Sequence, residues 1–166
     1  MGLLTLVLAL VGALTLALAA VFAFQAHQLR STDSASNLAL VDPSLTDEAI
    51  SSVSAGLNRV FTYDYADPSA TQKAASELLV GDASSQYKTL FDKLQSAASG
   101  QQLTLKTTTV LGGVTTLTPD SARLLVFLDQ SSTRASDSNS STAAAQLDVA
   151  AVKRDGVWKI SEIRPL

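Results

Sequence analysis

The spacing of apolar positions divides the chain into two parts. Residues Gly2 to Phe24 are almost entirely Leu, Ala, Val, Phe and Thr, and the first charged side chain is Arg30. At about 1.5 Å per residue, a helix of this length reaches roughly 34 Å, enough to cross the hydrocarbon core of a bilayer. A surface amphipathic helix is excluded because no polar stripe is left to face water. We therefore expect residues 1–29 to form a transmembrane anchor, with residues 3–24 in the bilayer.

The composition of this segment also bears on its retention and orientation. A cleaved signal peptide has a basic start and an apolar region of about 7–15 residues. Here the basic start is missing and the apolar run is longer, so we expect an uncleaved anchor, despite small-x-small triplets at Ala17–Ala19 and Phe24–Ala26. By the positive-inside rule, Arg30 taken alone favours a cytoplasmic domain, although one arginine determines the orientation poorly.

Helical periodicity follows a polar stretch, residues 30–44, which we expect to be a tether before a domain over residues 45–166. Apolar residues at spacings of three and four predict a first helix: Ile50, Val53, Leu57, Val60 and Phe61. Asp47 and Glu48 are expected in its first turn, where the helix dipole favours negative charge.

Two more helices are predicted from capping signals. Asp67 before Pro68 is a typical helix start. Gly81 is expected to end this second helix, and Asp82 to cap a third that ends near Gly100. One side of the third helix is expected to carry its large apolar residues, namely Tyr87, Leu90, Phe91 and Leu94.

The pattern then changes to alternation, which is typical of β-strands. Residues 103–111 alternate, Gly112–Gly113 predict a bulge or bend, and residues 122–129 are apolar on both faces, as expected of a central strand. Residues 131–141 contain many serines and no large apolar residue, so we expect an exposed, mobile hairpin loop there.

Asp155–Gly156 predict a two-residue type I′ turn. In that register Arg154 pairs with Val157 and Lys153 with Trp158, and one face carries the apolar residues Leu147, Val149, Ala151, Trp158 and Ile160. Because a single register sorts both strands, we expect a hairpin with Trp158 in the core and Lys153 against its ring.

Composition removes several classes of chemistry. The chain has no cysteine, and its one histidine, His27, lies at the membrane boundary. Thiolate or histidine metal sites, cysteine nucleophiles and a Ser-His-Asp triad are therefore excluded from the domain. The net charge is −3 without a basic cluster, so nucleic acid is not an expected partner. We assign no catalytic, cofactor-binding or metal-binding residues.

Two features leave alternatives open. Asp129 shares a strand face with Leu125 and Phe127, so its carboxylate either points into an apolar cavity, which would raise its pKa, or ends the strand in solvent. Tyr63 and Tyr65 flank Asp64 at a helix end, where they form either a ligand site or aromatic packing. We favour the structural alternative for both features.

The order of three helices followed by a curved antiparallel sheet resembles the cone-shaped nuclear-transport-factor-2-like fold. Residues 37–166 also resemble the Mce-associated membrane proteins of actinobacteria. The resemblance depends on five segments in a fixed order: NLALVDP, RVFTYDYADP, LLVGDASSQYKTLF, ARLLVFLDQSSTR and DGVWKISEIRPL. It implies a single-pass plasma-membrane protein with its α+β domain outside the cytoplasm, acting as a non-enzymatic accessory or stabilising subunit of an Mce lipid import complex. Many members of that family carry a charged cytoplasmic tail before the anchor, whereas this sequence begins at its apolar run, so it leaves the orientation open.

Two other functions fit the same layout. The cone could hold a lipid or steroid, with isomerase- or dehydratase-like proton transfer at Asp129. Alternatively, the chain could be an assembly module of a secretion system, because an inner-membrane component of type IV secretion has the same arrangement of anchor and cone.

Overall fold

Three helices precede four long strands in the part of the chain that the computed structural model describes, residues 37–136 and 140–166. The predicted anchor lies outside these residues, and within them no helix is both long and apolar enough to cross a bilayer. The elements are α2 (Pro43–Phe61), β1 (Tyr63–Asp64), α3 (Pro68–Leu78), α4 (Gly81–Gln101), β2 (Leu103–Leu117), β3 (Ser121–Arg134), β4 (Ser140–Arg154) and β5 (Val157–Pro165). This order confirms the predicted α+β class.

The helix starts differ from expectation: Asp67 makes no side-chain capping hydrogen bond at α3, and Asp82 lies in the first turn of α4 instead of capping it. Asp42 caps α2 by accepting a hydrogen bond from the Leu45 amide at 3.0 Å. The helix therefore begins at Pro43, and Asp47 and Glu48 lie in its second turn. Gly81 adopts a positive φ of 57° but begins α4, because α3 has already ended at Leu78.

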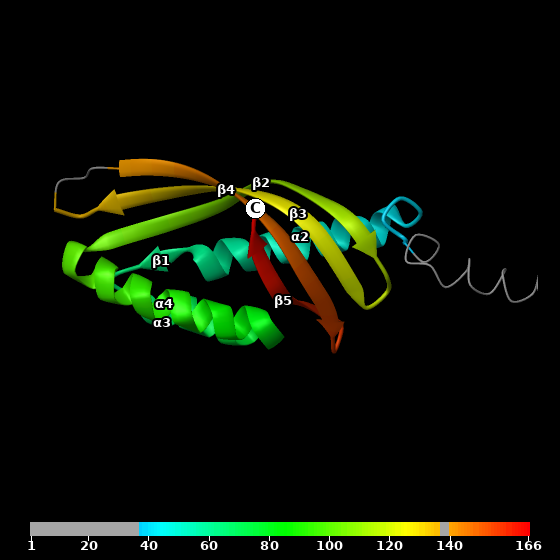
Figure 1. Ribbon diagram of the computed structural model, residues 1–166, viewed down its shortest axis with the longest axis horizontal. Coiled ribbons are helices and arrows are strands. Elements are labelled where there is room, and N and C mark those ends of the chain that lie inside the picture. Colours follow the sequence, from blue (N-terminus) through cyan, green and yellow to red (C-terminus); the bar gives the residue numbers. More distant parts are fainter. Residues whose placement is uncertain (1–36, 137–139) are drawn as a thin grey trace, which may run out of the picture. The chain divides into compact units, whose positions relative to one another are not determined.

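The strands form one antiparallel sheet in the order β1-β2-β3-β4-β5. The register shifts between Thr109 and Leu111, between Val114 and Thr116, and between Ala150 and Ala151. Bulges of this kind bend the bulged strand and increase its twist. The sheet accordingly curves over α2 as a half-barrel, and α3 and α4 lie on the same side (Figure 1).

The serine-rich segment differs from its prediction. β3 continues to Arg134 and β4 begins at Ser140, with Ser131 opposite Thr142 and Thr133 opposite Ser140. The prediction of a loop over residues 131–141 was therefore wrong for most of that range. Main-chain pairing continues past the point where the apolar alternation stops, because the ladder requires no apolar side chain.

The Asp155–Gly156 hairpin is confirmed. Both turn residues have positive φ, 52° and 74°, as a type I′ turn requires. Trp158 is buried opposite Lys153, whose ammonium lies 5.5 Å from the centre of the indole ring. Glu48 of α2 accepts hydrogen bonds from Trp158 Nε1 at 3.2 Å and Lys153 Nζ at 2.7 Å, which ties the hairpin to the first helix.

Candidate functional site

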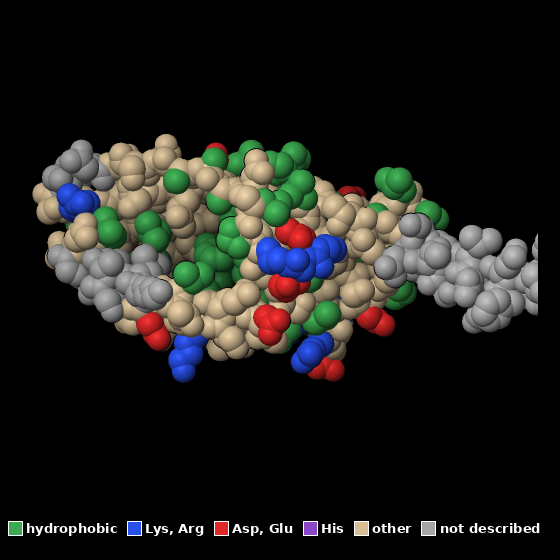
Figure 2. Space-filling model, in the orientation of Figure 1, with side chains coloured by type: hydrophobic (Ala, Val, Ile, Leu, Met, Phe, Trp, Pro, Cys, Tyr) green, Lys and Arg blue, Asp and Glu red, His purple; other side chains and the backbone are tan. Residues whose placement is uncertain are grey.

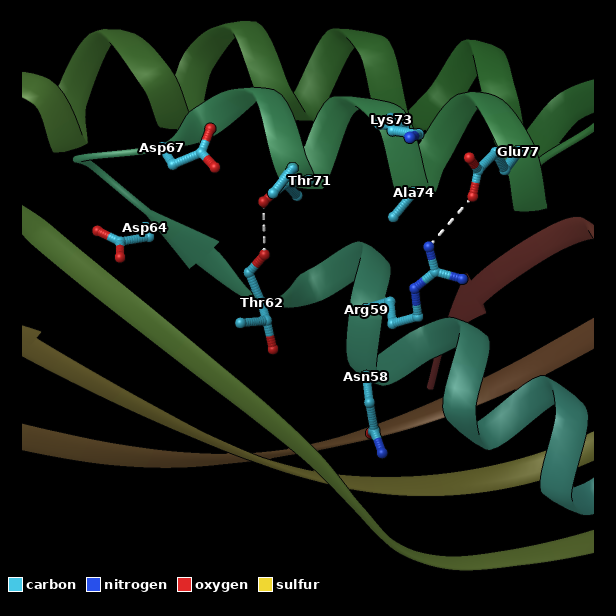
Figure 3. A pocket seen from close by; sticks show the side chains of 10 residues that line it. Asn58, Arg59, Thr62, Asp64, Asp67, Thr71, Lys73, Ala74 and Glu77 are labelled. Atoms are coloured by element: carbon cyan, nitrogen blue, oxygen red, sulfur yellow. Dashed lines mark hydrogen bonds and ion pairs between the residues drawn. The ribbon is translucent and has the colours of Figure 1, made fainter.

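A polar groove of about 640 Å³ lies between α2 and α3. Figure 3 shows the Arg59–Glu77 ion pair at one end, with a separation of 3.1 Å, and Asp64 and Asp67 at the other. Both members of the ion pair are about half exposed, so water screens the attraction and it contributes little to stability. Within the groove, the Thr71 hydroxyl donates to the Thr62 carbonyl at 2.7 Å.

Two carboxylates of this polar groove make local hydrogen bonds. Asp64 accepts a hydrogen bond from the Ala66 amide at 2.9 Å. The Ser69 hydroxyl donates to Asp67, which lowers the pKa of that carboxyl. In the described part of the chain, no three Asp, Glu or His side chains are grouped to hold a metal. Asp64 and Asp67 therefore hold the short connection between β1 and α3 through local hydrogen bonds.

A second hollow, the apolar groove, has a volume of about 470 Å³. Figure 2 shows hydrophobic side chains gathered in a hollow of this face. The groove is lined almost entirely by carbon, from α4, the end of α2, and the strands β4 and β5: Phe61, Ala83, Gln86, Tyr87, Thr89, Leu90, Leu147, Ile163 and Pro165. A hollow of this size and polarity is typical of a binding site.

Two α4 residues give the apolar groove its character. The Tyr87 ring stacks on Phe91 with centroids 5.5 Å apart. Its hydroxyl is buried and has no hydrogen-bond partner in the described structure, and burial raises the pKa of this tyrosine. Leu90, predicted to share one side of the helix with Tyr87 and Phe91, is 58% exposed. It lines the groove while remaining largely open to solvent, so it lies at the rim.

Asp129 and Tyr63, two residues singled out from the sequence, line neither of these two grooves. Asp129 is exposed and lies on the opposite face from the buried Leu124, Val126 and Leu128. It faces solvent from within β3, which continues to Arg134, so the expected strand end at Asp129 was wrong. Tyr63 is buried edge-to-face against Phe91, with centroids 6.0 Å apart. Tyr63 is therefore packed as an aromatic core residue.

The convex face of the sheet carries a charged network that sequence analysis did not identify. Arg123 donates three hydrogen bonds to Asp148, at 2.9, 3.2 and 2.8 Å, and lies 3.5 Å from Glu162. The hydrogen bond from Arg123 lowers the pKa of Asp148. Beside this network, the bulge at residue 110 leaves Val110 and Leu111 each 62% exposed.

The curated relatives found by sequence comparison match only about half of the chain. No protein-family model matches the chain. The uncharacterized proteins MT1407 and Rv1362c of Mycobacterium tuberculosis are each 40% identical to it over 90 residues, which is 53% of this chain. The match spans 40% of the length of those curated relatives.

Solved structures match over a larger share of the chain. An IcmL-like type IV secretion system protein from Legionella pneumophila aligns over 75% of this chain and 93% of its own, with a TM-score of 0.63 and 13% identity. CagV, a VirB8 homologue of the Helicobacter pylori type IV secretion system, aligns over 70% and 94%, with a TM-score of 0.56 and 11% identity. A periplasmic fragment of TraM aligns over 72% and 96%, with a TM-score of 0.54 and 13% identity. At these identities the likeness establishes a shared fold.

Proposed function

We propose that this chain is a non-catalytic assembly module of a membrane-associated complex in the cell envelope. The observation that supports it most is the fold, since two of the matching structures are type IV secretion proteins. The apolar groove agrees with this role, because its described lining is almost entirely carbon. A groove of this kind is suited to binding another molecule.

We further propose that the domain lies outside the cytoplasm and is held by the predicted anchor, residues 3–24. The periplasmic origin of the TraM fragment supports this location. The chain contains no cysteine, so a single Asp120→Cys variant, in an exposed turn, reports the location directly. A membrane-impermeant maleimide should label it in intact cells; labelling only after lysis would contradict an extracytoplasmic domain.

Two complexes are candidates for the partner. An Mce-type lipid import complex is supported by the five resembling segments alone, since the mycobacterial relatives are uncharacterized proteins. A secretion-type assembly is supported by the likeness of fold alone. Both candidates give the chain an assembly role, and identifying the partner subunits would distinguish the two complexes.

Capture from native membranes tests the assembly role. The tagged full-length chain is crosslinked in its own cells, purified in mild detergent and analysed by mass spectrometry. Recovery of Mce transporter subunits would support the lipid import complex, and recovery of secretion channel subunits the alternative. A chain recovered without stoichiometric partners, whose deletion leaves the abundance of both complexes unchanged, would contradict the proposal.

A lipid- or steroid-binding role is the second candidate, and the apolar groove is the observation that favours it. Isomerase- or dehydratase-like proton transfer at Asp129 is not supported, because Asp129 is exposed and does not line the groove. The remaining version is simple binding of an apolar molecule. Saturable binding of a radiolabelled sterol or fatty acid, lost in Leu90→Lys, would support that version.

A further inference from the structure

Strand β4 extends beyond its neighbour β5 and is paired on one side only in that region. β5 pairs with β4 from Leu147 to Arg154, whereas β4 begins at Ser140. Residues 140–146 pair with β3 without a register shift. No strand of the described chain pairs with their other edge. All of these residues are exposed, and none is charged or proline. We call residues 140–146 the open edge.

The direction of the main-chain groups follows from one hydrogen bond. The Gln146 carbonyl accepts from the Leu166 amide at 3.0 Å, on the β5 side. Main-chain groups of a strand alternate in direction with period two. The amides and carbonyls of Thr142 and Ala144 therefore also point to the open edge. Proteins usually protect such an edge with charge, proline or a bulge, and residues 140–146 have none of these.

The apolar groove lies directly beside the open edge. Leu147, the next residue of β4, lines the groove together with Pro165 at the end of β5. Ala143 and Ala145 share the face of Leu147 by the same alternation, so their small side chains extend the groove along β4. Figure 1 shows β4 continuing past the end of β5, and Figure 2 shows the hollow on this face. An added strand would continue the line of β5 and cover the hollow.

We propose that the open edge and the apolar groove together bind an extended, uncharged segment of a partner protein by strand addition. The inference rests on the proposed assembly function and names its contact surface. The Thr142 and Ala144 main-chain groups pair with the partner's main chain, continuing the existing β4–β5 ladder. Alternate apolar side chains of the partner enter the groove against Tyr87 and Leu90. A charged segment is disfavoured because no charged residue lines the groove in the described part of the chain.

A designed peptide tests the surface without knowledge of the natural partner. The probe is a short labelled peptide in which Val or Leu alternates with Thr, and its binding to the full-length chain in detergent is followed by fluorescence anisotropy. The control peptide has the same side chains but carries N-methyl groups on alternate amides. Strand addition requires those amides, whereas partition into micelles does not. We expect saturable binding of the probe and an affinity at least about tenfold lower for the N-methyl peptide.

Three variants locate the binding. Ala144→Pro removes an amide that points outward, at an edge position where proline is tolerated. Leu90→Lys places a charge at the rim of the groove, and Leu111→Lys makes the same change at a leucine exposed on the convex face. The first two should each weaken probe binding at least about tenfold, while the third binds like the native chain. Equal binding of the two peptides, or full binding by both Ala144→Pro and Leu90→Lys, would overturn the inference.

The same variants, used in the membrane capture experiment, distinguish a failure of the strand-addition surface from a failure of the proposed assembly function. Loss of partners by Ala144→Pro and Leu90→Lys, with retention by Leu111→Lys, supports both. Capture by all variants leaves the assembly function standing and overturns the strand-addition surface. Absence of partners from the native chain contradicts the function itself. A sterol or fatty acid that binds the groove where the peptide does not would overturn the inference in favour of a lipid site.

Discussion

Replacing Tyr87 by phenylalanine removes one buried oxygen and leaves the ring stacked on Phe91. The hydroxyl is buried with no hydrogen-bond partner in the described structure, and an unsatisfied buried polar group costs about 1–3 kcal/mol. Because the residue as a whole is only half-buried, we take the lower end of that range. We expect Tyr87→Phe to raise the free energy of unfolding by about 1 kcal/mol, which corresponds to an increase in Tm of about 2–4 °C.

The pH dependence gives a second, independent result. Burial raises the pKa of Tyr87, whereas in the unfolded chain a tyrosine ionises near pH 10. Below that pH the proton is bound in both states, so the advantage of Tyr87→Phe is constant. Above it the unfolded native chain releases a proton that the folded chain retains, and native stability falls as pH rises. The advantage of the variant should therefore increase above about pH 10.

Thermal and guanidinium unfolding of the full-length chain, followed by near-ultraviolet circular dichroism at pH 7–11, measures both effects. Tyr65→Phe is the matched control, because Tyr65 is exposed; it should change stability by less than about 0.5 kcal/mol. A loss of about 1 kcal/mol or more in Tyr87→Phe at pH 7 would refute the reasoning, because such a loss means the hydroxyl has a partner.

Three further predictions concern stability and use the same unfolding measurements. Leu124→Ala, at a fully buried position, should lower the free energy of unfolding by about 2–5 kcal/mol. Leu111→Ala at the surface should lower it by less than about 0.5 kcal/mol. Equal losses would contradict the assignment of Leu124 to the core. Gly156→Ala forces a side chain into a φ of +74° and should cost about 1–2 kcal/mol, with an unchanged Tm as the contrary result. Arg123 lowers the pKa of Asp148, so this pair stabilises the fold above the ordinary aspartate pKa, and the stabilisation is lost as pH falls. Arg123→Met should therefore make the free energy of unfolding depend less on pH in the acid range. An unchanged dependence would show that the pair contributes nothing.

Local chemistry was enough to predict the hairpin around Asp155–Gly156. The turn fixes the register, and only one register sorts apolar from polar side chains on both strands, so Trp158 could be placed in the core. Helix positions followed from periodicity for the same reason. The start of α2 was missed by a few residues. The acidic Asp47 and Glu48 also indicate a first helical turn, and the sequence alone does not show that Asp42 is the residue that caps the helix.

The candidate site could not be predicted in the same way. The apolar groove brings together Phe61, Leu90, Leu147 and Pro165, residues far apart in the chain, and nothing in their local sequence distinguishes a groove wall from a packed core. β3 is apolar on both faces, so its pattern could not say whether Leu124 or Leu125 points inward, nor on which face Asp129 lies. The open edge was missed because serine and threonine pair through main-chain atoms, which leave no periodic signal.

The hydrogen bond from Trp158 to Glu48 joins residues 110 positions apart, and it has a practical meaning for experiments on fragments. The helical layer and the β-layer each supply half of one interior, so neither is a foldable unit alone. A fragment ending before β2 would leave the apolar stripe of α2 uncovered and prone to aggregate. Interaction mapping by truncation would consequently report misfolding as loss of binding, and surface point substitutions are the sounder tool for this protein.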